Sequence, residues 1–130
     1  MMHRGLKNLK LKTMCFNTTK SARAKIAKTD IECWKYLFPD NSPPFPGVHG
    51  INTPYQQNEI SEKVKIRKNG FCSIDKGYHS YKNENTCINN SKHYSEWMDI
   101  EVIIKKFIIP AGTCYYENSK EYVSETIIML

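Results

Sequence analysis

Residues 70–83, with the sequence GFCSIDKGYHSYKN, carry the densest set of side chains that could do chemistry. They include two glycines, three aromatic rings, a thiol, an imidazole and lysine ammonium groups. If residues 78–81 are extended, alternation places Tyr78 and Ser80 on one face and His79 and Tyr81 on the other. Tyrosine rings offer stacking surfaces and cationic side chains bind phosphate, so the mixture suits a nucleotide-like ligand.

The candidate ligand-binding residues are aromatic, cationic or imidazole side chains from several segments of the chain. They are Trp34, Tyr36, Tyr55, Arg67, His79, Tyr81 and Lys82. We name no catalytic residue. A histidine on a strand beside aromatic residues more often makes structural hydrogen bonds, so a structural role for His79 stays open. Cys72 with His79 as its base is a further alternative, but nothing nearby indicates a lowered thiol pKa.

The five cysteines show no metal-binding pattern, because no two of them are two to four residues apart and no histidine pair flanks them. We expect reduced, mostly buried thiols. The sequence also has no phosphate-binding loop, paired-histidine metal motif or nucleophile elbow. It therefore predicts neither a metal ion nor another cofactor.

Length and composition indicate one folded domain. The chain has 130 residues, of which 40% are hydrophobic and 12% aromatic, and this composition excludes a disordered protein. Residues 1–28 hold eight Lys and Arg and no acid, which leaves 11 basic and 13 acidic residues in the rest. The net charge of +6 therefore belongs to the N-terminal arm. Without a matching motif, we do not favour a nucleic-acid role for this arm.

The domain division follows from this charge distribution. We interpret residues 1–13 as a basic, flexible leader and residues 14–130 as a single α+β domain. No apolar run is long enough to span a membrane, and no apolar segment follows the basic start as in a secretion signal. The expected location is the cytosol of a host cell, with no membrane partner.

The hydrophobic pattern predicts an α+β fold with a mainly antiparallel sheet of about six strands and one or two short helices. A short helix is expected from Asn83 or Asn85 to about Tyr94. The expected strands are residues 31–38, 59–67, 78–81, 99–109, 113–116 and 127–130, with a further short strand at 71–75. Residues 39–50 contain four prolines and two glycines and predict a long loop.

Two of these strands carry further predictions. Residues 31–38 have apolar or aromatic side chains in both alternating phases, which is typical of a central strand. In residues 99–109, Phe107 and Ile109 are out of phase with Val102 and Ile104. A β-bulge at Lys105–Lys106 would bring them onto one apolar face, and we predict one there. The apolar end of the chain either pairs within the sheet or offers an edge to a second subunit, which leaves a homodimer open.

Several motifs together resemble a family of small proteins encoded by phages and mobile elements of gut bacteria. They are DIECWK at residues 30–35, KGYHSY at 76–81, IIPAGTCYY at 108–116 and EYVSETII at 121–128. The resemblance spans about residues 14–130. Two residues depart from the family pattern, since Ala111 stands where a lysine is usual and Trp34 where a tyrosine is. The resemblance implies a viral accessory or counter-defence protein, and it implies no mechanism.

Three classes of function remain open. The first, which we favour, is a non-catalytic binder, or sponge, of a nucleotide-like or anionic host signal molecule. The second is a protein–protein inhibitor that contacts a host factor through Trp34, Tyr36 and the proline-rich loop. The third, which we favour least, is a nucleotide-directed transferase or phosphodiesterase. Glu121 and Glu125 lack the spacing that two same-face strand carboxylates need, which argues against this enzyme.

Overall fold

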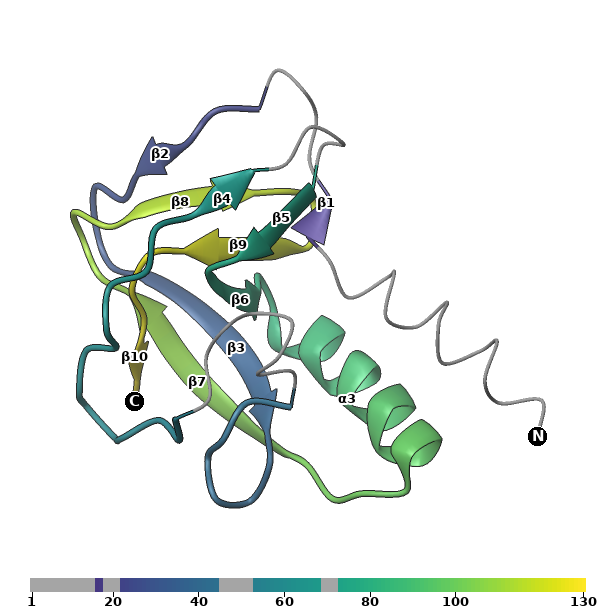
Figure 1. The fold of residues 1–130 in the computed structure, drawn as a ribbon. Coiled ribbons are helices and arrows are strands. Elements are labelled where there is room, and N and C mark those ends of the chain that lie inside the picture. The colour runs from purple at the N-terminus through teal and green to yellow at the C-terminus, as the bar shows by residue number, and fades with distance from the viewer. Residues whose placement is uncertain (1–15, 18–21, 45–52, 69–72) are drawn as a thin grey trace.

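The computed structural model describes residues 16–17, 22–44, 53–68 and 73–130, and these form a mixed α+β structure that is mostly antiparallel sheet (Figure 1). A seven-stranded sheet has the order β10-β7-β3-β6-β9-β8-β2, and a smaller sheet has the order β1-β5-β4. The expected fold class is confirmed, with more strands than the six predicted. The expected basic leader lies outside the described residues.

Five strands of the large sheet overlap predicted strands. The large sheet contains β2 (Lys25–Ile26), β3 (Ile31–Leu37), β6 (Tyr78–Tyr81), β7 (Ile103–Ile109), β8 (Cys114–Glu117), β9 (Glu121–Ser124) and β10 (Ile128–Met129). The small sheet contains β1 (Phe16–Asn17), β4 (Arg67–Lys68) and β5 (Ser73–Lys76).

Strands β3 and β7 are the two longest strands of the large sheet, and both are interior strands. They pair antiparallel over seven residues, from Ile31 opposite Ile109 to Leu37 opposite Ile103, and the register does not shift. The predicted bulge at Lys105–Lys106 is therefore wrong. Both faces of β7 pack against other parts of the protein, so apolar side chains occupy both phases of the strand. The apolar residues change from one alternating phase to the other because both faces of β7 are covered, and no bulged residue is needed to explain this.

Different layers cover the two faces of the large sheet. One face, which we call the α3 face, packs against helix α3 (Glu84–Met98) and, through Val123 and Ile74, against the small sheet. The opposite face, which we call the Lys35 face, holds the largest core cluster. That cluster includes Cys33, Leu37, Tyr55, Tyr78, Phe107, Ile109, Ile127 and Met129. The two layers leave only Glu32 of β3 and Lys106 of β7 fully exposed.

Helix α3 begins and ends at residues with suitable caps. The side chain of Asn83 accepts a hydrogen bond from the backbone N–H of Thr86, as expected for an N-cap. Asp99 ends the helix in the left-handed conformation, and its N–H donates to the carbonyl oxygen of Ser95. Cys87, Ser91 and Tyr94 face the sheet. The predicted start is confirmed, and the helix continues one turn beyond the predicted end.

Residues 59–67 were expected to form a strand, and this prediction is wrong for most of the segment. Only Ile60 makes an isolated bridge, to Ile128, and only Arg67 enters a strand, β4. The segment instead crosses the C-terminal end of the chain through single hydrogen bonds. In these, the N–H groups of Ser61 and Val64 donate to the carbonyl oxygens of Ile127 and Glu125. Despite its alternating side chains, this segment is irregular and covers the C-terminal end of the chain.

No helix in the described part of the chain has the length and apolar composition that a membrane crossing requires.

Candidate functional site

Two lysines lie directly opposite each other on adjacent interior strands. Lys35 of β3 pairs with Lys105 of β7, and both side chains are on the Lys35 face because their neighbours in the register, Leu37 and Phe107, are in its core. Cross-strand neighbours on one face have Cβ atoms about 5 Å apart, so the two side chains can reach the same region of this face. Two cations on adjacent interior strands are a candidate for binding an anion.

Lys35 is enclosed by the protein. The residue is 7% exposed, and its Nζ donates a hydrogen bond to the backbone carbonyl oxygen of His79. Burial lowers the pKa of Lys35 to about 8, and the nearby thiols of Cys33 and Cys87 offset part of this effect. Lys105 is half-buried, so the pair extends from the interior toward solvent.

No carboxylate neutralises this pair among the side chains that the structure describes. None of the ion pairs among them includes Lys35 or Lys105. The ranges outside the description, 1–15, 18–21, 45–52 and 69–72, contain no Asp or Glu, and Asp75 is the one acidic residue whose side chain is not described. Charges in protein interiors are usually paired, because desolvation of a lone charge is costly. A bound anion would supply the missing counter-charge.

Two buried hydroxyl groups lie in the same region of the Lys35 face. The ring centre of Tyr55 is 5.8 Å from Lys35 Nζ, and the backbone N–H of Tyr55 donates to the carbonyl oxygen of Asn41, which holds the residue over the sheet. Tyr55 is 8% exposed and Ser80 is 2% exposed. The Tyr55 hydroxyl has no hydrogen-bond partner among the described residues, whereas the Ser80 hydroxyl lies within hydrogen-bond reach of the Cys33 thiol. Buried hydroxyls are normally satisfied, so the lone Tyr55 donor near Lys35 indicates room for an acceptor.

Three of the predicted site residues form an aromatic cluster on the α3 face instead. Tyr36 is buried beneath α3 and contacts the rings of Tyr81 and Tyr94, with centroids 6.2 and 5.5 Å away. Trp34 is half-buried at the edge of the same cluster, and Lys106 lies over its ring at 5.8 Å. The aromatic side chains of this face therefore pack against the helix. Burial raises the pKa of both Tyr36 and Tyr81, so both phenols are neutral at ordinary pH.

The other predicted residues are spread over the molecule. His79 is buried on the α3 face opposite Val123, and its Nδ1 is 3.2 Å from the carbonyl oxygen of Gly77. Arg67 is in β4 of the small sheet, where its backbone pairs with Lys76. Only Tyr55 joins the lysine pair. The structure thus brings Trp34, Tyr36 and Tyr81 together and leaves Arg67 and Lys82 elsewhere.

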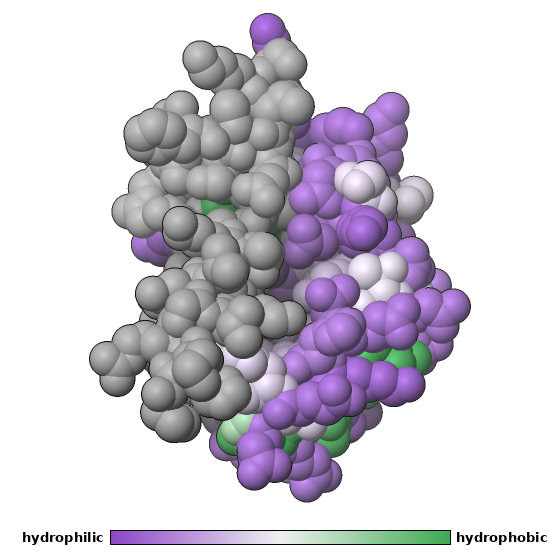
Figure 2. All heavy atoms as spheres, turned by 90° about the vertical axis from the view of Figure 1, so that its right-hand side faces the viewer, coloured by the Kyte–Doolittle hydropathy of each residue, from purple (hydrophilic) through white to green (hydrophobic). Residues whose placement is uncertain are grey.

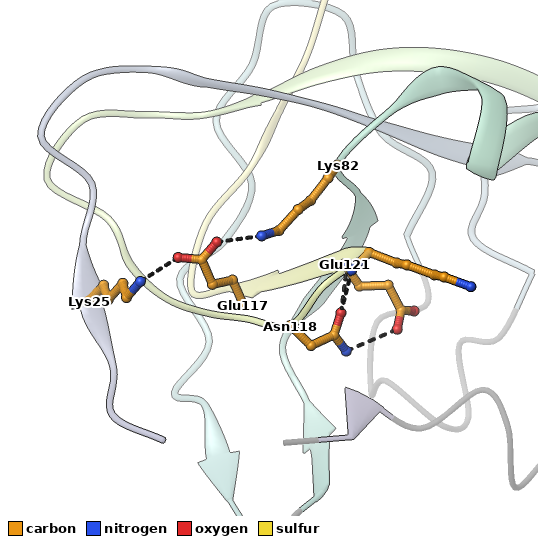
Figure 3. A network of polar contacts seen from close by, with 6 residues as sticks. Lys25, Lys82, Glu117, Asn118 and Glu121 are labelled. Carbon is orange, nitrogen blue, oxygen red and sulfur yellow. Dashed lines mark hydrogen bonds and ion pairs between the residues drawn. The ribbon is translucent and has the colours of Figure 1, made fainter. Parts of the chain in front are cut away.

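Lys82 belongs to a separate ion-pair network (Figure 3). Its Nζ and that of Lys25 each lie 2.5 Å from a different carboxylate oxygen of Glu117, which they approach from opposite sides. Lys82 also lies over the ring of Tyr122 at 5.2 Å. The hydrogen bonds from Lys25 and then Lys82 lower the pKa of Glu117. Both lysines are neutralised in part, so this network is a weaker candidate for an anion than the pair at Lys35 and Lys105.

A shallow hollow of about 430 Å³ lies at one end of the sheet, lined by Phe38, Pro39, Asp40, Ile100 and Glu101. Ile100 and the neighbouring Met98 are 41% and 42% exposed. The described surface on the α3 side is otherwise mostly hydrophilic, with apolar areas near its lower end (Figure 2). The hollow is a candidate contact surface for another protein.

Sequence reasoning missed the lysine pair, although one signal was present. Lys35 occupies the same phase of its strand as Ile31, Cys33 and Leu37, which all face the core. A lysine among inward-facing positions of a central strand is unusual and marks a buried charge. The incorrect prediction of a bulge concealed Lys105, because a bulge at that point would place Lys105 and Phe107 on opposite faces of the sheet.

Comparisons with family models, with curated proteins and with solved structures found no match to this chain. The candidate site is therefore argued from its own geometry.

Proposed function

We propose that the protein binds a small anionic molecule of the nucleotide type between Lys35 and Lys105, without converting it. The observation that carries the proposal is the cross-strand pair itself, two cations on one sheet face without a described carboxylate partner. A phosphate between them would restore the counter-charge that burial requires.

The surroundings of the pair support a nucleotide-like ligand. The buried hydroxyl of Tyr55 would donate a hydrogen bond to a phosphate oxygen. Within the described residues, no group of three or more His, Cys, Asp and Glu side chains gathers as metal ligands do. The proposed site therefore relies on ammonium and hydroxyl donors.

The biological role we propose is that of a phage-type accessory protein that sequesters a nucleotide-like host signal in the host cytosol. The resemblance of the KGYHSY, IIPAGTCYY and EYVSETII motifs to phage-encoded proteins supports this role. A binder without turnover suits sequestration, because the bound signal is removed from its receptor.

Retention of an intact ligand tests the proposal. The protein is incubated with a panel of mononucleotides, dinucleotides and cyclic nucleotides, separated from free ligand, and heated to release what it holds. Mass spectrometry should find an unmodified nucleotide. Lys105→Met should lose it, because the pair is broken. Lys106→Met is the matched control, since Lys106 lies on the α3 face and pairs with Glu32. Release of nothing across the panel, or equal retention by Lys105→Met, would contradict the proposal.

Binding to a host protein is the second candidate function, and the hollow at Phe38 and Ile100 favours it. This surface is open, whereas α3 covers the Trp34 and Tyr36 face first considered for such a contact. An inhibitor of this type should lose its partner when Ile100 is replaced by Asp. Ile60→Asp serves as the control, because Ile60 is more exposed than Ile100 and does not line the hollow. Equal binding by both variants would exclude the hollow.

A further inference from the structure

The surroundings of Lys35 resemble those of lysine amines that act as nucleophiles. Only the neutral form of a lysine amine carries the lone pair that attacks carbon. Burial favours this neutral form, as in enzymes that use a lysine nucleophile. Lys35 is enclosed in the interior, and Lys105 lies directly opposite it in the strand register. A buried amine therefore lies across from a cation that can hold an anionic group.

We propose that the amine of Lys35 forms an imine with a small aldehyde or ketone that also carries a phosphate or carboxylate, which Lys105 holds. This inference rests on the anion site of the proposed function and adds a covalent step to it. The ligand class is a carbonyl compound with an anionic group a few atoms from the carbonyl carbon.

The proposed step is a condensation that needs no other reactant. The lone pair of Lys35 Nζ forms a bond to the carbonyl carbon, and the carbon–oxygen π electrons move to oxygen. A proton passes from nitrogen to that oxygen and gives a carbinolamine. The hydroxyl then leaves as water with the second proton of nitrogen, and a carbon–nitrogen double bond forms. No electron is gained or lost, and water is the only other product.

The neighbouring groups favour Lys35 over other nucleophiles in the same core. Cys33 is two residues away on the same face, but burial raises the pKa of its thiol to about 11, so it holds little thiolate. The same burial lowers the pKa of Lys35 to about 8, so the amine is partly neutral near neutral pH. The hydroxyl of Tyr55, which has no described partner, is available as a donor to the carbonyl oxygen.

Reductive trapping tests the inference on the full chain. The protein is treated with glyoxylate, a small aldehyde with a carboxylate, and cyanoborohydride, which adds hydride to an imine and fixes it as a secondary amine. Peptide mass spectrometry then maps the modified lysines. Lys35 should react at least about tenfold faster than Lys63, whose side chain is 75% exposed. Acetaldehyde, which lacks the anionic group, should modify Lys35 more slowly than glyoxylate, and inorganic phosphate should protect Lys35 from glyoxylate.

Two variants separate the parts of the inference. Lys105→Met should remove both the preference for glyoxylate and the protection by phosphate, whereas Lys106→Met should retain them. If the exposed lysines are modified and Lys35 is not, the imine proposal is overturned. Nucleotide retention would then still be judged by its own experiment. Equal rates with glyoxylate and acetaldehyde, without protection by phosphate, would overturn the inference together with the anion site.

Discussion

Lys35 is a charge that the fold encloses without a carboxylate beside it. A surface position would keep the ammonium group hydrated, and an apolar side chain would pack at the same position without a desolvation cost. The single described hydrogen bond, to the carbonyl oxygen of His79, offsets only part of that cost. Groups with strongly shifted pKa values gather at functional sites. This uncompensated cost is the observation behind the proposal that Lys35 binds an anion.

The variant Lys35→Met measures this cost through its pH dependence. Below about pH 8 the amine is protonated in both the folded and unfolded states, so the full penalty is present. Between about 8 and 10.5 the folded state has lost the proton and the unfolded state has not, so the penalty falls as pH rises. Near pH 7, Lys35→Met should increase the free energy of unfolding by about 2 kcal/mol, after allowance for the lost hydrogen bond.

Urea denaturation of both proteins near pH 7 and near pH 10 checks this expectation. The difference between the two proteins should shrink or change sign at the higher pH. Comparison with the wild type is needed because the buried thiols and tyrosines, whose pKa values are raised, act in the opposite direction above about pH 9. An equal destabilisation by Lys35→Met at both pH values would show that the ammonium carries no burial penalty.

At the scale of elements, the sequence predicted a helix or strand correctly where local residues determine it. Asn83 predicted the start of α3 because its side chain caps a backbone N–H. The two apolar phases of residues 31–38 predicted a central strand, and β3 lies between β7 and β6. Residues 59–67 have a strand-like alternation, but β10 is only two residues long and cannot support a longer ladder there. That outcome depends on distant parts of the chain.

The turn between β5 and β6 depends on Gly77. Its φ is +135°, and a Cβ added there would lie 2.6 Å from Cγ2 of Val123. Gly77→Ala should therefore lower the free energy of unfolding by about 2–4 kcal/mol, through backbone strain and a steric clash in the core. Gly112→Ala is the matched control, because φ is +89° and the space beside it is open. Strain alone should cost about 1 kcal/mol there.

Thermal or urea unfolding of the two glycine variants measures both effects. Equal losses in Gly77→Ala and Gly112→Ala would mean that Val123 moves aside without cost. The packing of β6 against β9, which positions Ser80 and the carbonyl group of His79 near Lys35, would then be looser than the structure indicates.

For the molecule as a whole, the sequence predicted the residue types of a binding site more readily than their arrangement. Seven residues were expected to act together, but α3 covers Trp34, Tyr36 and Tyr81, and Tyr55 lies on the opposite face. Which face a side chain occupies follows from alternation within one strand. Which strands become neighbours depends on the order of the whole sheet, and Lys105 reaches Lys35 only through the pairing of β3 with β7.

The state of association also follows from the complete sheet. The apolar C-terminal strand was expected either to pair within the sheet or to offer an edge to a second subunit. It pairs with β7, and residues 57–61 of the same chain bridge to it from the other side. Its edge is thus covered, and we expect the protein to elute from a sizing column as a monomer of 15.2 kDa. A dimer that persists on dilution would require another contact surface.

The central claim is that an anion binds between Lys35 and Lys105, and the pKa of Lys35 tests it most directly. Side-chain nuclear magnetic resonance can follow the titration of Lys35 in inorganic phosphate and in chloride at the same ionic strength. A bound phosphate favours the charged ammonium, so the pKa should rise from about 8 toward its ordinary value. The rise should be absent in Lys105→Met and present in Lys106→Met. The same pKa in phosphate and in chloride would contradict the account.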